Sequence, residues 1–195
     1  EIKDNIEIIS GDVCDQDLVR KITKDINIIF HLAALISIPY SYVSPRSYIT
    51  TNVIGTLYLL ETLKNSNIEL MVNTSTSEVY GSAQYSPIDE AHPLNAQSPY
   101  AATKISADQL CLSYYKSFEL PITVLRPFNT FGPRQSLRAA IPTIISQALE
   151  KKKTIKMGNI STKRDFSYVS DTVSGFSSCI DNIKCLGLIE EKNKD

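Results

Sequence analysis

Residues 68–78 read IELMVNTSTSE, and this stretch decides the fold. Its first part, Ile68 to Asn73, is apolar enough to form a strand that is covered on both faces. Its second part, Thr74 to Glu78, is polar and begins where such a strand would end. Ligands of open parallel sheets bind at the carboxyl ends of the strands. The stretch therefore predicts a buried parallel strand that leads directly into a binding site.

Apolar strands and amphipathic helices alternate on both sides of this stretch. Further strands are predicted at Ile6–Ile9, Ile26–Leu32 and Ile122–Leu125. Helices are predicted at Asp15–Lys24, Pro45–Asn65, Pro99–Phe118, Ile141–Lys152 and Asp171–Ile183. The longest helix has Ser98 as its N-cap and Pro99 at its first position. We therefore predict an α/β fold with a doubly wound parallel sheet and helices on both faces, and a surface loop over Gln84–Gln97.

The composition argues against several classes of protein. The chain has 195 residues, with 20 Lys plus Arg against 21 Asp plus Glu, a net charge of −1 and a pI of about 6.2. A nucleic-acid-binding protein would need a basic face, which this balance does not favour. No apolar run reaches the roughly 18 residues of a membrane helix, and no export signal is visible. We expect a cytoplasmic protein that binds neither nucleic acid nor membrane.

The cysteines and histidines do not have the spacing of a metal site. The four cysteines are Cys14, Cys111, Cys179 and Cys185. No two of them form a C-x-x-C pair, and the only two histidines, His31 and His92, are far apart. We therefore expect no metal and buried thiols in a reducing compartment. His31 lies inside an apolar run, and we predict a packed core residue rather than a base.

Tyr100 and Lys104 lie four residues apart on the helix predicted from Pro99, so they share one face. A lysine ammonium beside a tyrosine, near a cationic nicotinamide, favours the phenolate and lowers the tyrosine pKa from about 10. Such a phenolate can take a proton from a sugar hydroxyl as hydride leaves the carbon. The spacing by itself is common, and a solvent-facing lysine beside an interfacial tyrosine would explain it equally well.

Thr76, Ser77 and Glu78 form a second cluster, directly after the strand of residues 68–73. A hydroxyl group there can bind a substrate oxygen. A carboxylate at the mouth of a closed cleft can act as a base on a C–H bond next to a ketone. Taken alone, Glu78 could equally be a solvated loop carboxylate or a helix cap.

A series of sequence runs resembles the extended short-chain dehydrogenase/reductase family, in its NAD-dependent epimerase/dehydratase branch. The runs are Gly11–Asp15, His31–Ala34, Thr51–Thr56, Ser75–Gly81, Tyr100–Lys104, Arg126–Gln135 and Arg164–Val169. They occur in the family's order and extend to about Gly175, and they imply a Rossmann-like fold. Residues 133–136, 140–142 and 158–159 most resemble the UDP-N-acetylglucosamine 4,6-dehydratases of legionaminic-acid biosynthesis.

The resemblance implies NAD as the cofactor and a set of residues that would contact it. These are Asp12, Val13, Leu32, Ala33, Ala34, Thr51, Ser75, Tyr100 and Lys104. Asp12 would accept a hydrogen bond from the adenine amino group. Ala33 and Ala34 would allow a close approach of the pyrophosphate and ribose, and Lys104 would also contact the nicotinamide ribose.

The resemblance also implies a catalytic set of Thr76, Glu78, Tyr100 and Lys104. Tyr100 would take the O4 proton of a nucleotide sugar, polarised by Thr76, while C4 gives hydride to NAD⁺. Glu78 would then take the C5 proton and water would leave from C6. Hydride would return to C6, which leaves a 4-keto-6-deoxy sugar. The substrate would be bound by Thr76, Ser77, Asn129 and Arg164, with the guanidinium of Arg164 on its diphosphate.

Ser77 departs from the dTDP-glucose dehydratase branch, where an Asp protonates the leaving hydroxyl. Either Glu78 would serve both steps or a water molecule would relay the proton. The same Thr-Ser-Glu run occurs in GDP-mannose dehydratases and in UDP-glucuronate decarboxylases. A decarboxylase or a 4-epimerase therefore stays open as an alternative, as do the identity of the nucleotide and the choice of NAD or NADP.

The family's G-x-x-G-x-x-G turn is absent, because no two glycines of the chain are three residues apart. We therefore expect a truncated form of the fold, without the first βαβ unit and most of the substrate domain. Residues 1–135 would form a partial NAD-binding domain, 136–170 the start of a substrate-binding domain, and 171–195 a return helix and a divergent tail. Such a chain could be an inactive fragment that binds NAD weakly and is marginally stable. The resemblance suggests a homodimer through the helices of Leu57 and Leu110, although those stripes could equally be core.

Overall fold

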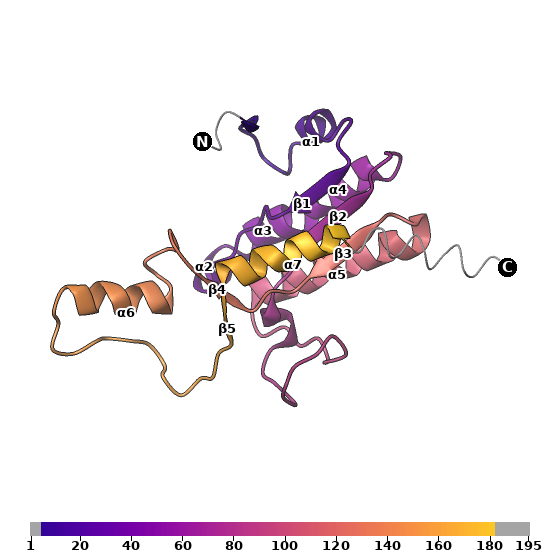
Figure 1. Ribbon diagram of the computed structural model, residues 1–195. Helices are drawn as coiled ribbons and strands as arrows, with labels where there is room; N and C mark the ends of the chain where they lie inside the picture. Colours follow the sequence, from indigo (N-terminus) through magenta and orange to yellow (C-terminus); the bar gives the residue numbers. More distant parts are fainter. Residues whose placement is uncertain (1–4, 182–195) are drawn as a thin grey trace.

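The computed structural model describes residues 5–181 and contains a three-stranded parallel sheet (Figure 1). The strands are β1 (Ile28–His31), β2 (Leu70–Thr74) and β3 (Ile122–Leu125), in the order β1-β2-β3. Ile28 pairs with Leu70, and Met71 pairs with Ile122. Leu70, Met71 and Val72 are buried because β2 has a strand on each side. The strands predicted around residues 68–73 and 122–125 are thus confirmed.

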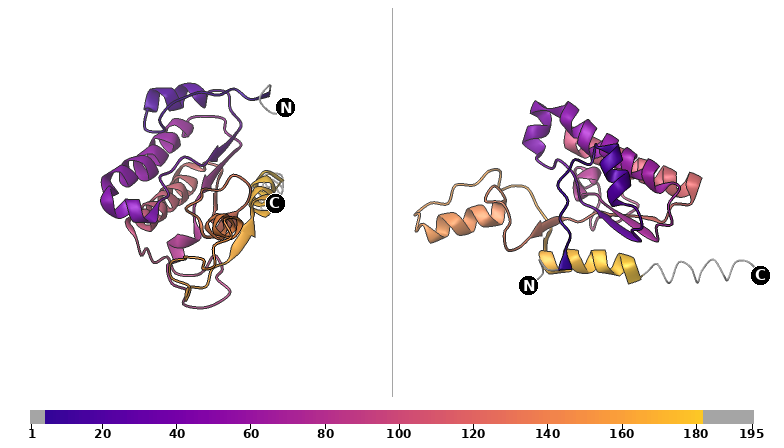
Figure 2. Two further views of the ribbon diagram at one scale, coloured as in Figure 1. Left: turned by 90° about the vertical axis from the view of Figure 1, so that its left-hand side faces the viewer. Right: turned by 90° about the horizontal axis from the view of Figure 1, so that it is seen from above.

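Helices cover both faces of this sheet, as predicted. One face carries α4 (Gly55–Leu63) and α5 (Pro99–Phe118), and α1 (Gln16–Ile22) packs against α4. The other face carries α7 (Val169–Asp181), which lies across the sheet from α4 and α5 (Figure 2). The core between the sheet and α1, α4 and α5 consists of Val19, Leu59, Leu60, Leu63, Ile68, Met71, Cys111, Tyr114 and Leu120.

The segment predicted as one helix from Pro45 to Asn65 is helical but not uniform. After the short α2 (Ile38–Val43), the chain forms α3 (Pro45–Tyr48), the π-helix η2 (Ile49–Ile54) and then α4. The apolar stripe is only partly buried, since Leu60 and Leu63 lie in the core and Ile49 is half exposed. Leu57 and Leu110 both pack against the core, in agreement with the alternative that these stripes belong to it.

A second sheet joins β4 (Asn129–Phe131) to β5 (Phe166–Tyr168) in parallel. The connection between them carries α6 (Ala140–Leu149), which stands away from the main sheet (Figures 1 and 2). The helix ends at Leu149, before the predicted Lys152, and Lys151 has a left-handed backbone with φ 53°. The helix predicted from Asp171 begins at Val169, and its predicted end, Ile183, lies outside the described residues, as does Cys185.

The strand predicted at Ile6–Ile9 is wrong. These residues form no strand, and Ile6, Ile8 and Ile9 are 53%, 82% and 50% exposed. Among residues 5–181 no strand pairs with them, because β1 pairs with β2 alone in the described sheet. A β-branched run without a neighbour cannot form ladder hydrogen bonds or bury its side chains. For the same reason β1 is shorter than predicted, and its Phe30 is 40% exposed although it packs edge-on against Phe176 of α7.

Residues 5–181 contain neither a membrane-spanning helix nor a cluster of metal ligands. No described helix is both long and apolar enough to cross a membrane. The same residues contain no group of three or more His, Cys, Asp or Glu that could hold a metal ion. The thiol of Cys111 is buried, whereas Cys14 and Cys179 are only partly buried, so the expectation of buried thiols holds for one of these three.

Candidate active site

The start of α5 faces the carboxyl end of β2. The Ser98 side chain accepts a hydrogen bond from Ala101 N at 3.1 Å, and Pro99 occupies the first turn, so the helix begins where the sequence predicts. Tyr100, Lys104 and Asp108 then follow at intervals of four residues, which places them along one side of α5. All three are buried. This side of the helix packs against the polar stretch that follows β2.

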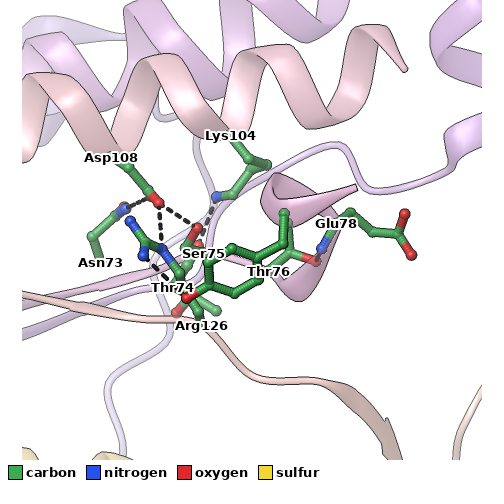
Figure 3. Close-up of polar contacts among 9 residues, drawn as sticks. Asn73, Thr74, Ser75, Thr76, Glu78, Lys104, Asp108 and Arg126 are labelled. Carbon is green, nitrogen blue, oxygen red and sulfur yellow. Dashed lines mark hydrogen bonds and ion pairs between the residues drawn. The ribbon is translucent and has the colours of Figure 1, made fainter. Parts of the chain in front are cut away.

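Lys104 is fixed to the end of β2. Its ammonium donates a hydrogen bond to the backbone oxygen of Thr74 at 2.6 Å (Figure 3). Burial lowers the Lys104 pKa, and the negative charge of Asp108 acts in the opposite direction. The residue is 4% exposed, so its charge depends on the groups that surround it.

Tyr100 lies against Thr76, and their side chains are hydrogen-bonded. Burial raises the Tyr100 pKa, a hydrogen bond with the Thr76 side chain opposes that rise, and the charge of Glu78 adds to it. The expectation that Lys104 lowers this pKa is therefore not met by the chain itself, because burial outweighs the other influences. The ring packs edge-on against Tyr48 at 6.3 Å between centroids. The phenol is thus held in place but protonated at neutral pH.

Thr76, Ser77 and Glu78 leave the end of β2 in a tight turn. Thr76 is the N-cap of the 3-10 helix η3 (Ser77–Tyr80), and its side chain accepts from Glu78 N at 3.2 Å. The Glu78 carboxylate faces the segment that contains Arg164. Its Oε1 lies 3.9 Å from Arg164 Nη1.

A cavity of about 400 Å³ adjoins Glu78 and brings together most of the predicted substrate residues. Its lining includes Ser77, Glu78, Asn129 and Arg164, which come from η3, β4 and the segment before β5. Lys163 and Gln97 also line it, although the sequence indicated no role in binding for either of them. A larger cavity of about 750 Å³ lies between α6 and the second sheet, and it contains none of the predicted catalytic residues.

The residues predicted to contact a cofactor lie near the carboxyl end of β1. Leu32 and Ala33 follow β1 directly and are exposed, and Ala34 and Thr51 are partly buried. Val13 packs against Gly55, where an added Cβ would come within 2.6 Å of the valine Cγ1. Asp12 is exposed, and its carboxylate accepts from Cys14 N at 2.8 Å. Ser75 follows β2, and its buried hydroxyl donates to Asp108 at 2.8 Å.

Asp108 and Arg126 are polar residues of the site that the sequence analysis did not assign. Arg126 follows β3, and its Nε donates to Asp108 Oδ2 at 3.0 Å (Figure 3). The sequence does contain a signal for Asp108, which lies four residues after Lys104 on the same helix. Residues at this spacing share one face, so Asp108 faces the sheet if Lys104 does. The pairing with Arg126 had no signal in the sequence.

His31 is a packed residue, as predicted. Its Nε2 lies 2.9 Å from Thr56 Oγ1, which itself donates to the Asn52 backbone oxygen at 2.8 Å. The threonine hydroxyl must therefore accept from His31, which assigns the Nε2–H tautomer. Burial, aided by the charge of Lys104, lowers the His31 pKa to about 4. The imidazole is neutral at neutral pH.

The sequence model described as GDP-mannose 4,6 dehydratase matches residues 1–187. The chain belongs to this family. The match extends to residue 187, past Gly175, where the motifs quoted above end. In the family's NAD-dependent epimerase/dehydratase branch, curated relatives include a dTDP-D-glucose 4,6-dehydratase of Dictyostelium discoideum, 35% identical over 88% of this chain and 43% of that protein. Another, from Streptomyces niveus, is 34% identical over 86% of this chain and 50% of its own length.

Solved structures show the same fold. A UDP-N-acetylglucosamine 4-epimerase from Methanobrevibacter ruminantium superposes with a TM-score of 0.81 and 38% identity, over 87% of this chain and 56% of that one. A UDP-glucuronic acid 4-epimerase from Bacillus cereus, solved with UDP-glucuronic acid and NAD, superposes with a TM-score of 0.81 and 34% identity. This match covers 88% of this chain and 55% of that one. These similarities confirm the Rossmann-like fold. The chain spans about half the length of the relatives it matches.

Proposed function

We propose that this family member takes part in the 4,6-dehydration of a nucleotide sugar, with NAD as the cofactor. The observation that carries the proposal is the meeting of Tyr100, Thr76 and Lys104 at the end of β2, beside the cavity that contains Glu78. The relatives called 4,6-dehydratases support this reaction class. UDP-N-acetylglucosamine is our proposed substrate, on the sequence resemblance of residues 133–142 to that branch.

The residues at the ends of β1 and β2 fit part of an NAD molecule. Ala33 has a small exposed side chain after β1, and buried Lys104 and Tyr100 supply a cation and a phenol near the next strand. The chain lacks the glycine-rich turn that binds pyrophosphate at a helix N-terminus. We assign Asp12, Val13, Leu32, Ala34, Thr51 and Ser75 to the same face. When bound, NAD would accept hydride from C4, return it to C6, and favour the Tyr100 phenolate by its positive ring.

The protons would be moved by Tyr100 and Glu78. Tyr100 would take the O4 proton of the sugar. The Thr76 hydroxyl, which lies against Tyr100, can donate a hydrogen bond to the same sugar oxygen. Once C4 is a ketone, the C5 proton becomes acidic, and Glu78 would remove it from the cavity side. Arg164 and Asn129 line that cavity, and we assign them to the diphosphate and the sugar. Residues 1–135 would supply the cofactor face and 136–170 the start of the substrate side.

Loss of the C6 hydroxyl needs an acid, and Ser77 is too weak to be one. Glu78 and Asp165 both line the cavity, and Glu78 holds a proton after the preceding step. We propose that it returns this proton to the leaving hydroxyl, directly or through water. A Ser77→Asp variant tests this assignment, because a second acid should raise the rate of water loss if protonation limits it.

A 4-epimerase is the second candidate, because the two solved structures described above carry that name. Epimerisation needs Tyr100 and Thr76 but no elimination by Glu78. A decarboxylase would need a carboxylated sugar at the same site. An inactive protein with the family fold is the alternative outside enzyme catalysis.

Mass spectrometry separates these functions. The protein would be incubated with NAD and, separately, UDP-N-acetylglucosamine, dTDP-glucose, GDP-mannose and UDP-glucuronate. Dehydration gives a product lighter by one water, and this result from any of the first three supports the proposal. A product of unchanged mass but altered sugar indicates an epimerase, and loss of carbon dioxide from UDP-glucuronate indicates a decarboxylase. No conversion of any sugar contradicts an enzymatic role.

We also propose a homodimer, on the family resemblance. Leu112, Tyr115 and Phe118 of α5 expose apolar surface and are the side chains of that helix available for such a contact. Sedimentation of the purified chain would measure its mass in solution. A monomer at high concentration would contradict the assignment.

A further inference from the structure

Asp108 is a buried carboxylate to which the proposed reaction assigns no role. It is 0% exposed. Its oxygens accept hydrogen bonds from Ser75 Oγ at 2.8 Å, Arg126 Nε at 3.0 Å and Asn73 Nδ2 at 3.3 Å (Figure 3). Burial raises the Asp108 pKa, while Ser75 and Arg126 oppose that rise. An ionised carboxylate is kept inside a protein only where such donors and charges compensate its lost hydration.

These contacts join α5 to successive residues of β2. Asn73 and Ser75 bind Asp108, and the backbone oxygen of Thr74 between them binds Lys104. Lys104 is one helical turn before Asp108, so both side chains face the same stretch of the strand. The position of the Lys104 ammonium and that of the Asp108 carboxylate are therefore fixed by one set of contacts.

Lys104 needs a nearby anion if it is to stay charged. Its ammonium donates to the Thr74 backbone carbonyl, and a neutral acceptor compensates only part of the lost hydration. Asp108 is the first of the groups that raise the Lys104 pKa, ahead of Cys111 on the same helix. Two further titratable groups lie near this pair. His31 of β1 is close to the Lys104 charge, and Tyr100 at the start of α5 is close to the Asp108 charge.

We propose that Asp108 is a positioning residue that keeps the Lys104 ammonium charged and seated against the end of β2, with Arg126 and Ser75 holding the carboxylate in place. The importance of this for catalysis rests on the proposed function, in which the Lys104 cation and the Tyr100 phenol lie together at the NAD site. The placement of the charge itself does not require that function.

A purely structural role for Asp108 makes a different prediction. Arg126 also donates to the Tyr80 hydroxyl at 3.2 Å, and its guanidinium lies 5.3 Å from the centre of the Tyr80 ring. Asp108 could serve only to neutralise Arg126 in this cluster. In that case, removing the charges of Asp108 and Arg126 together would leave no unpaired charge in the cluster, and the Lys104 pKa would not change.

The test is a titration of Lys104 by NMR in the 195-residue chain labelled with ¹³C-lysine. A Lys104→Arg variant identifies the ε-carbon resonance. Wild type, Asp108→Asn, Asp108→Glu and Asp108→Asn/Arg126→Gln are titrated, and circular dichroism confirms that each is folded. The double variant replaces both charged side chains by neutral ones of similar size and leaves no unpaired charge. It can therefore still be titrated if Asp108→Asn alone does not fold.

We expect the Lys104 transition to fall by about one pH unit or more in Asp108→Asn and in the double variant, a tenfold or greater loss of proton affinity. Asp108→Glu keeps the charge and should restore the wild-type transition. An unchanged transition in the double variant overturns the proposal and leaves the structural role. Because no turnover is measured, a failure here is distinct from a failure of the dehydration assay.

Discussion

Arg164 Nη1 lies 3.9 Å from Glu78 Oε1, across a cavity whose two sides come from distant parts of the chain. Both side chains are partly exposed, at 51% and 30%. At this distance and exposure the ion pair contributes little to stability. The ion pair instead shows that two proposed functional groups face the same cavity. They are the Glu78 carboxylate, which we assign as the base, and the Arg164 guanidinium, which we assign to the diphosphate.

Glu78→Gln should stop elimination and leave oxidation at C4 intact. The amide cannot accept the C5 proton, so we expect the dehydrated product to form about 10²–10⁴-fold more slowly. Reduced nicotinamide should still accumulate on the protein, which its absorbance would reveal. Asp165→Asn, which removes another carboxylate from the cavity lining, is the matched control and should retain product formation. Normal dehydration by Glu78→Gln would contradict the assignment.

The buried His31 should make stability fall in mild acid. Its folded pKa is about 4 against an ordinary value of 6.5, so the unfolded chain binds the proton first as the pH falls. The stability due to neutral His31 is therefore fully present above pH 6.5 and is lost progressively toward pH 4. The loss between pH 6.5 and 5 should be about 2 kcal/mol.

Urea unfolding of wild type and His31→Gln at pH 7 and pH 5 measures this effect. Glutamine does not titrate, so the variant should show the smaller decrease in unfolding free energy between the two values. Equal decreases in both proteins would show that His31 is not the group responsible.

Gly81→Ala should destabilise the turn after η3. Gly81 has φ 64° and ψ −142°, a region that side chains strongly disfavour, and an added Cβ would collide with the backbone oxygen of Asn95. We expect a loss of about 1–3 kcal/mol. Gly158→Ala is the matched control, because nothing lies within 4 Å of its added Cβ. Equal unfolding midpoints for the two variants would contradict the expectation.

The isolated chain should bind NAD only weakly. Without two glycines three residues apart, it has no tight turn through which backbone N–H groups approach the pyrophosphate. Isothermal titration should give a dissociation constant well above the micromolar range. Micromolar binding would contradict this expectation and would show that the residues after β1 and β2 suffice.

The sequence by itself determined the local parts of this protein. The apolar run before Asn73 specified a buried parallel strand, and Ser98 with Pro99 specified the start of α5, because strands and helix caps depend on residues close in the chain. The four-residue spacing placed Tyr100 and Lys104 on one helix face. Family motifs then predicted that Thr76, Ser77 and Glu78 belong to one site.

The tertiary structure decided what those local parts meet. Ile6–Ile9 resembles a strand but lies unpaired, because pairing depends on a neighbouring strand and not on the run itself. Asp108 of α5 meets Arg126 after β3, and Glu78 of η3 faces Arg164 before β5, only because the fold brings these separate elements together. Burial, which sequence spacing does not measure, raised the Tyr100 pKa that a neighbouring lysine was expected to lower.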